Sequence, residues 1–316
     1  MIVGGDVGGE RAGALAADLR PAVGNEDQSG GEPQDQRRDV RGELPHATSG
    51  LGAVRRKAIA LDGYLGPLLL FVCFYVATLF LFRWLAFQLA GLIAVTVATT
   101  LTITIWDRRQ WPLGLFIPPR AAAREFAIGI AWGVLLIVGG ALLITLSTEV
   151  RHAPGRGFPW RELITLFIPA VLHEEMLFRG YPFQKLLRGN RPFAYIFVAL
   201  IFALLHAGNR GVTLLALTNV FLGGILLGLA YERYGHLWFP IGLHLAWNLT
   251  SGPILGDEVS GFTGEASVFI ERGGGAWWMT GGRFGMEGSV WMTAVEIVAI
   301  VVLWKMNAEC RMQNRE

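Results

Sequence analysis

Long apolar runs, which follow one another from Tyr64 onward, constrain the fold of this chain more than any other feature of its sequence. A helix that crosses the ~30 Å hydrocarbon layer of a bilayer needs about 20 predominantly apolar residues. Backbone polar groups must pair with one another inside lipid, which restricts spanning segments to helices and closed barrels. We therefore predict an all-α fold, a polytopic membrane helical bundle with about eight transmembrane helices. Their predicted ranges are 64–82, 84–106, 126–147, 162–182, 193–208, 212–231, 236–250 and 289–305.

The composition also indicates that lipid surrounds most of the chain. Only 16% of the 316 residues are charged, whereas soluble domains carry about 25% charged residues. We therefore expect an integral membrane protein with the lipid bilayer as its surroundings. The net charge of +2 gives no reason to expect a nucleic-acid partner. The two cysteines, Cys73 and Cys310, have neither the spacing of a disulfide framework nor that of a zinc finger.

Residues 1–57 differ in composition from the rest of the chain. They contain no Phe, Trp or Tyr, so they bury too little apolar area to offset the entropy cost of ordering. We predict a disordered N-terminal segment; the alternative is a mis-assigned start codon, with the membrane protein beginning near Leu51. The remaining parts are the first two spans with their loop (58–125), a core (126–250), an extramembrane loop (251–288) and the last span with the tail (289–316).

The loop charges predict an orientation for these helices. Basic residues collect on the cytoplasmic side of membrane proteins, and here they precede the first span and fill the second loop, the fourth loop and the C-terminal tail. Both termini are therefore expected in the cytoplasm. The third loop, with Arg151, Arg156 and Arg161, fits this orientation poorly. The Gly-, Ala- and Arg-rich N-terminal segment is typical of a high-GC bacterial gene, which indicates a bacterial cytoplasmic membrane.

Two pairs of glycines are spaced for close helix packing. Gly129 and Gly133 lie about one helical turn apart, as do Gly224 and Gly228. Small residues at this spacing let helices approach closely in lipid. We expect these glycines to serve packing rather than chemistry.

Ionisable residues inside the predicted spans are the best candidates for function. A charge near the bilayer centre costs about 2.5–3.5 kcal/mol on insertion scales. Glu174, Glu175 and Arg179 all lie in the fourth span. Glu175 and Arg179 are spaced i, i+4 and can form an ion pair on one helix face, which could be purely structural. Because successive residues are about 100° apart around a helix, Glu174 points elsewhere and remains available as a general base.

Two later spans contribute further polar side chains. His206 lies near the end of the fifth span, where an interfacial histidine with no role in chemistry is the simpler explanation. His244 and Asn248 are spaced i, i+4 in the seventh span. This pair could donate hydrogen bonds to an oxyanion or only join two helices. Together with Glu174, these residue types can activate a water and stabilise a tetrahedral intermediate.

A zinc site is an alternative use of the same side chains. Glu174, His206 and His244 are residue types that ligate Zn²⁺, which would then activate a water. His173-Glu174 does not continue as HExxH, however, because position 177 is Leu, so the helical zinc-protease signature is absent. The cofactor stays open, with zinc as the candidate.

Three motifs on successive apolar runs resemble the CPBP family, which comprises CAAX prenyl endopeptidases and bacteriocin-processing (Abi) membrane proteins. The resemblance covers about residues 120–250. Each motif is loose by itself, whereas the ordered set of three is specific. The motifs are Glu174-Glu175-xxx-Arg179, Phe202-xxx-His206 and His244-xxx-Asn248.

The resemblance implies a role for each motif residue. Glu174 and His206 would activate the attacking water, and His244 and Asn248 would form the oxyanion site. Glu175, with its ion-pair partner Arg179, would support this geometry. The family pattern leaves open whether the chemistry is metal-dependent or of the glutamate type.

The activity implied by the resemblance is that of an endopeptidase acting on membrane-associated, CAAX-like substrates. Prenylated CAAX proteins are not expected in bacteria, so "CAAX" could describe ancestry rather than substrate. One alternative is a non-catalytic bacteriocin self-immunity or peptide-binding membrane protein. Another is a proton-coupled transporter with a Glu/His relay, although the two halves show no inverted repeat of broken helices.

The predicted ranges contain one geometric conflict. Glu174 lies in the inner half of the fourth span, whereas His206 lies near the outer end of the fifth. An extension of the fourth helix to Leu187 would bring Glu174 close to mid-depth. We expect this extension.

Overall fold

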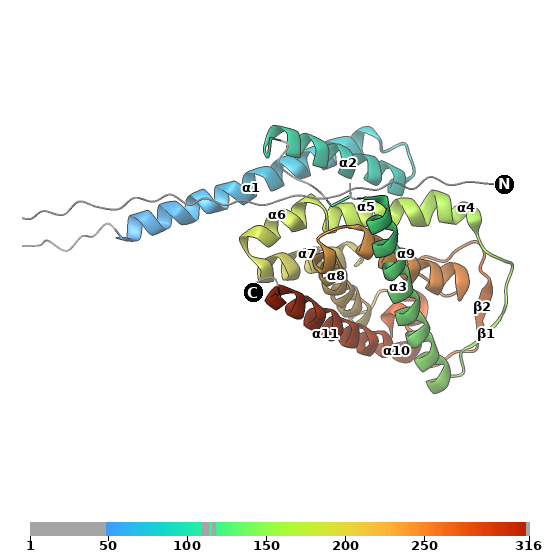
Figure 1. Ribbon diagram of the computed structural model, residues 1–316. Helices are drawn as coiled ribbons and strands as arrows, with labels where there is room; N and C mark the ends of the chain where they lie inside the picture. Colours follow the sequence, from blue (N-terminus) through green and yellow to red (C-terminus); the bar gives the residue numbers. More distant parts are fainter. Residues whose placement is uncertain (1–48, 109–113, 116–117, 314–316) are drawn as a thin grey trace, which may run out of the picture. The chain divides into compact units, whose positions relative to one another are not determined.

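The computed structural model describes residues 49–108, 114–115 and 118–313. They fold into helices with one small two-stranded sheet (Figure 1), which confirms the predicted helical membrane bundle. The longer helices are α1 (Ser49–Leu81), α2 (Phe87–Ile105), α3 (Pro119–Ser147), α5 (Ile168–Phe178), α6 (Tyr181–Gly189), α7 (Arg191–Leu205), α8 (Leu214–Tyr234), α9 (Trp238–Leu249) and α11 (Val290–Gln313).

Five helices of the described chain are long and apolar enough to cross a bilayer. They comprise the second part of α1 (Gly63–Leu81) and the whole of α2, α3, α8 and α11. By length and composition, the predicted number of about eight spans is therefore too high. The sheet pairs β1 (Arg151–Pro154) with β2 (Phe269–Arg272) in antiparallel register, and the sequence did not predict it.

The predicted fourth, fifth and seventh spans are shorter helices. The fourth consists of α4 (Trp160–Glu162), a π-helical turn (Leu163–Phe167) and α5. The expected extension to Leu187 is wrong, because α5 ends at Phe178 and the chain turns at Gly180 before α6 begins. A Cβ on Gly180 would lie 2.0 Å from the carbonyl oxygen of Met176, so this turn requires a glycine.

Most of the predicted disordered segment lies outside the described residues. The described chain begins at Ser49, where α1 starts, and α1 continues without a break to Leu81. Residues 49–57 are therefore helical, and the predicted boundary at residue 57 lies inside a helix. The prediction for residues 1–48 stays untested.

Helix α9 is buried because α3 packs along it at very short distance (Figure 1). A Cβ on Gly129 would lie 2.3 Å from the carbonyl oxygen of Phe239, and one on Gly133 would lie 2.4 Å from that of Leu243. Gly242 of α9 faces α3 in the same way. The predicted packing role of Gly129 and Gly133 is confirmed. A helix enclosed by protein in this way need not reach across the lipid by itself.

The second glycine pair serves the packing of α8. A Cβ on Gly224 would lie 2.9 Å from Ala199 of α7, and one on Gly228 would lie 2.8 Å from the ring of Tyr195. Their predicted packing role is also confirmed. On another side, α8 contacts α11, where the Asn307 side-chain amide donates to a carbonyl oxygen of α8 at 2.9 Å.

The outward faces of the long helices are apolar. Large hydrophobic side chains stay exposed along α1, α3 and α11, a pattern that a water-soluble monomer rarely tolerates over so large an area. Examples are Leu69, Val72, Leu135, Leu142, Leu146, Val298 and Val301. Lipid is the solvent that suits these faces, and the chain is an integral, multi-pass membrane protein.

The substitution Gly133→Ala should destabilise the protein by about 1–3 kcal/mol, because its new methyl group must push α9 away from α3. Gly139→Ala on the same helix is the matched control, since a Cβ there meets no atom within 4 Å. Thermal unfolding of the purified proteins in detergent measures the difference. Equal melting temperatures for the two variants would contradict the close packing of α3 on α9.

Candidate active site

One cavity collects the four side chains that the sequence predicts to be catalytic. Glu174 from α5, His206 at the end of α7, and His244 and Asn248 from α9 all line a cavity of about 370 Å³. These residues are far apart in the sequence, and the packing of α5, α7 and α9 brings them to a common wall. The cavity is therefore the candidate active site.

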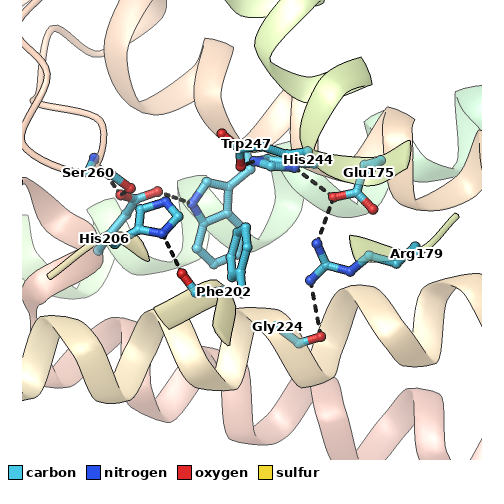
Figure 2. A network of polar contacts seen from close by, with 10 residues as sticks. Glu175, Arg179, Phe202, His206, Gly224, His244, Trp247 and Ser260 are labelled. Carbon is cyan, nitrogen blue, oxygen red and sulfur yellow. Dashed lines mark hydrogen bonds and ion pairs between the residues drawn. The ribbon is translucent and has the colours of Figure 1, made fainter. Parts of the chain in front are cut away.

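The carboxylate of Glu175 is the centre of a buried network behind this wall (Figure 2). Its Oε1 accepts a hydrogen bond from Arg179 Nη1 at 3.1 Å, which confirms the predicted i, i+4 ion pair. The same oxygen accepts a hydrogen bond from His244 Nδ1 at 2.8 Å. The network extends to α8, where the carbonyl oxygen of Gly224 accepts from Arg179 Nη2 at 3.1 Å. Three helices are thus joined through one ion pair.

Arg179 is a cation with almost no access to solvent, since 1% of its side chain is exposed. Besides Glu175 and Gly224, it contacts the face of the Phe202 ring at 4.8 Å. Such a contact stabilises a guanidinium in a desolvated site. Arg179 also ends α5, and the Gln184 side-chain amide donates to its carbonyl oxygen. These contacts offset the cost of burying the Arg179 charge.

The two adjacent carboxylates differ in exposure and in partners. The Glu174 side chain is 27% exposed, whereas Glu175 is fully buried. Glu174 Oε2 lies 3.8 Å from His244 Nε2. Because His244 donates a hydrogen bond from Nδ1 to the Glu175 carboxylate, Nε2 is the ring nitrogen that faces the cavity. Glu174 and His244 Nε2 therefore face each other at the candidate active site.

His206 is oriented by its own helix. Its Nδ1 lies 2.7 Å from the carbonyl oxygen of Phe202. A carbonyl oxygen only accepts, so Nδ1 carries a proton and Nε2 of the neutral ring is a free acceptor. The Phe202 ring packs against His206 at 4.7 Å and edge-on against His244 at 6.4 Å. Asn248 is half-buried in the cavity wall, one turn beyond His244.

A second polar network at the cavity was missed by the sequence analysis. Glu287 lies in the predicted extramembrane loop, yet it lines the cavity and is buried. Its Oε1 accepts from Trp247 Nε1 at 2.7 Å, and its Oε2 accepts from the amide and hydroxyl groups of Ser260 at 2.6 Å (Figure 2). The Asn219 side chain donates to its carbonyl oxygen. Part of the loop 251–288 thus forms a wall of the candidate site.

Asp257 holds this loop wall in place. Its carboxyl oxygens accept from the backbone N–H groups of Met286 at 2.6 Å and Glu258 at 2.9 Å. Burial and, secondarily, the nearby Glu271 carboxylate raise the pKa of Asp257 well above its ordinary value. A neutral carboxyl group can keep both hydrogen bonds without placing a second full charge beside Glu271. Asp257 thereby links the loop to the segment that carries Glu287.

The role of Glu174, His206 and His244 as zinc ligands stays a prediction. No three His, Cys, Asp or Glu side chains in the described part of the chain are grouped so that they could hold a metal ion. His244 donates through Nδ1 to Glu175, and its Nε2 lies 3.8 Å from Glu174 Oε2. Glu174, His206 and His244 line the same cavity.

The comparison with known families places this site in a class. Residues 156–250 match the family described as Rce1-like, type II CAAX prenyl endopeptidase. The match covers less than half of the chain, but it includes all three motifs, and it confirms the resemblance to the CPBP group over this region. It supports a membrane protease of the CAAX type. No match was found among curated proteins or among solved structures.

Removal of the Glu175 carboxylate should cost about 3–5 kcal/mol of stability, because Arg179 would stay buried without its counter-charge. We expect Glu175→Ala to lower the melting temperature strongly. Glu174→Ala should change it little, since Glu174 is partly exposed and lies outside this ion pair. Thermal unfolding of both variants in detergent checks this contrast, and similar losses of stability in the two would contradict it.

Proposed function

We propose that this protein is an intramembrane endopeptidase that hydrolyses peptide bonds of membrane-associated substrates in the cavity. The observation that carries the proposal is the common cavity of Glu174, His206, His244 and Asn248, within the residues that match type II CAAX prenyl endopeptidases. The Gly-, Ala- and Arg-rich N-terminal segment supports a location in a bacterial cytoplasmic membrane, and the loop charges support cytoplasmic termini. Two cytoplasmic termini require an even number of crossings, so this orientation needs a further crossing besides the five long apolar helices.

Glu174 and His206 are proposed to activate the attacking water. Glu174 is the carboxylate that is not held by Arg179, and it is accessible from the cavity. The free Nε2 of His206 offers a second acceptor from α7. A water between these groups would lose a proton to Glu174 as its oxygen attacks the scissile carbonyl carbon.

His244 and Asn248 are proposed to stabilise the tetrahedral intermediate. A His244 ring protonated at both nitrogens donates Nδ1–H to Glu175 and Nε2–H into the cavity. The side-chain amide of Asn248 is a second donor on the same face of α9. Donors fixed before the reaction are most effective where charge develops in the transition state.

The second half of the reaction uses the same carboxyl group. Protonated Glu174 would return its proton to the leaving amine nitrogen as the C–N bond breaks, which leaves a free carboxyl group on one product and a free amine on the other. Glu175 and Arg179 act through His244, whose orientation they hold. They are therefore positioning residues rather than catalytic ones.

The substrate is proposed to be a membrane-associated peptide or protein. Apolar side chains from several elements, including Leu166, Phe167, Phe202 and Phe262, form much of the cavity wall. Such a wall accommodates apolar peptide segments that arrive from the bilayer. The similarity to CAAX endopeptidases does not require that the substrate be prenylated.

Glu174→Ala should abolish cleavage, because loss of a general acid–base lowers rates by about 10²- to 10⁴-fold. A comparison of membrane proteomes from cells that produce the wild type or this variant detects the cleaved peptides and identifies the substrates. Glu265→Ala, which removes an exposed carboxylate from the loop, is the control and should resemble the wild type. Identical peptides in wild-type and Glu174→Ala membranes would contradict the proposal and favour a non-catalytic peptide-binding or immunity protein.

Cleavage should persist after chelation, because the described side chains are not grouped to hold a metal ion. The measurement combines metal analysis of the purified protein with its activity before and after dialysis against a chelator. Stoichiometric zinc that is lost together with activity, and restored with it, would contradict this prediction.

A further inference from the structure

A buried carboxyl group that the proposed reaction does not use also lines the cavity. Glu296 belongs to α11, which lies outside the residues that match the family, and only 2% of it is exposed. It contributes to the cavity wall beside Gly223 of α8, where a Cβ would lie 3.4 Å from Glu296 Oε1. The glycine therefore leaves room next to the carboxyl group.

Glu296 lacks a partner among the described residues for one of its oxygens. Its Oε2 is buried and receives no hydrogen bond there. A buried carboxyl group without a donor is unfavourable, and the protein side of Glu296 does not supply one. Glu296 also lines the cavity, so a water or a bound ligand there could bring a donor to this carboxyl group.

The neighbouring charges determine which donor suits this position. Glu287 interacts electrostatically with Glu296, and its own oxygens are occupied by Trp247 and Ser260. Both carboxyl oxygens of Glu287 thus already accept hydrogen bonds. Glu287 therefore offers no positive charge to Glu296.

The cavity as a whole has an excess of acidic side chains. Glu174, Glu287 and Glu296 line it together with His206 and His244, and among the described lining residues the only Lys or Arg is Arg210, whose side chain is exposed. A surface with this balance favours a positively charged ligand. Val220, Leu226 and Leu227 of α8 add an apolar wall, which suits the methylene stem of a long basic side chain.

We propose that Glu296 is a specificity-determining residue that binds a lysine or arginine side chain of the peptide substrate. The proposal rests on the proposed endopeptidase function, because it names the substrate class of the same cavity. The ammonium or guanidinium group supplies the donors that Glu296 lacks, and Gly223 provides the space for it. Substrates of this protein should therefore carry a basic residue close to the scissile bond.

The test compares purified protein on pairs of quenched fluorescent peptides in detergent micelles. The members of each pair differ only in lysine or its uncharged analogue norleucine, at successive positions on both sides of the scissile bond. Wild type should prefer lysine at one position. Glu296→Gln should lower the kcat/KM ratio of lysine to norleucine peptide by roughly 10- to 100-fold, as expected for loss of a hydrogen bond to a charged group. This ratio of kcat/KM values does not change when part of the protein is unfolded, because both peptides are cleaved by the same folded fraction.

Two matched variants complete the design. Glu309→Gln makes the same change at an exposed position of α11 and should keep the wild-type ratio. Gly223→Leu fills the space beside Glu296 and should lower the ratio even if Glu296→Gln folds poorly. A wild type without lysine preference, or an unchanged ratio in Glu296→Gln, overturns the proposal and leaves water as the partner of Glu296.

A binding measurement separates this proposal from the proposed function. Fluorescence anisotropy with the same peptides in the Glu174→Gln background needs no cleavage. In Glu174→Gln, the lysine peptide should bind more tightly than the norleucine peptide, and this difference should disappear in Glu174→Gln/Glu296→Gln. That result supports the site even if the wild type cleaves neither peptide. Equal binding of both peptides overturns the proposed role of Glu296. Cleavage that persists in Glu174→Ala overturns only the proposed mechanism.

Discussion

The candidate site depends on a single buried carboxylate. Glu175 Oε1 accepts hydrogen bonds from Arg179 and His244 at the same time. Two ionised groups inside a membrane protein are tolerated only when they are paired and hydrogen-bonded, and here the pairing also joins α5 to α8 and α9. The need to neutralise Arg179 therefore fixes the orientation of His244. Glu174, one residue earlier, is left free to face the cavity.

Close helix packing makes this arrangement compatible with a bilayer. Helices α5 and α9 are short, yet they carry most of the candidate site. They are enclosed by longer helices, and glycines at the contacts of α3 with α9 and of α8 with α7 let backbones approach. Polar side chains can then lie at membrane depth without contact with lipid. The apolar surface that meets lipid is supplied by α1, α3 and α11.

Much of the fold and of the candidate site could be predicted from local patterns. Apolar run length located most of the helices, and i, i+4 spacing identified the Glu175–Arg179 pair. Run length failed where helices are enclosed by protein, because such helices need not cross the lipid alone. It also failed at Gly180, where α5 ends, and in the loop 251–288, whose sheet forms between two distant segments. Glu296 is an acidic residue inside an apolar run, which made it unusual in the sequence. Its neighbours in the sequence did not indicate whether its side chain faces lipid or the protein interior.

The sequence by itself determined that this is a helical membrane protein, and that Glu174, His206, His244 and Asn248 are the residues to examine. Those conclusions depend on hydrophobicity, on spacing along one helix and on the resemblance of three ordered motifs to a known family, all of which can be read from the order of residues in the chain. Only the tertiary structure decided that the four side chains share a cavity, that Glu175 binds His244, and that Glu287 and Glu296 complete the wall. Those contacts join residues from different helices, and their geometry arises only when α8, α9 and α11 pack together.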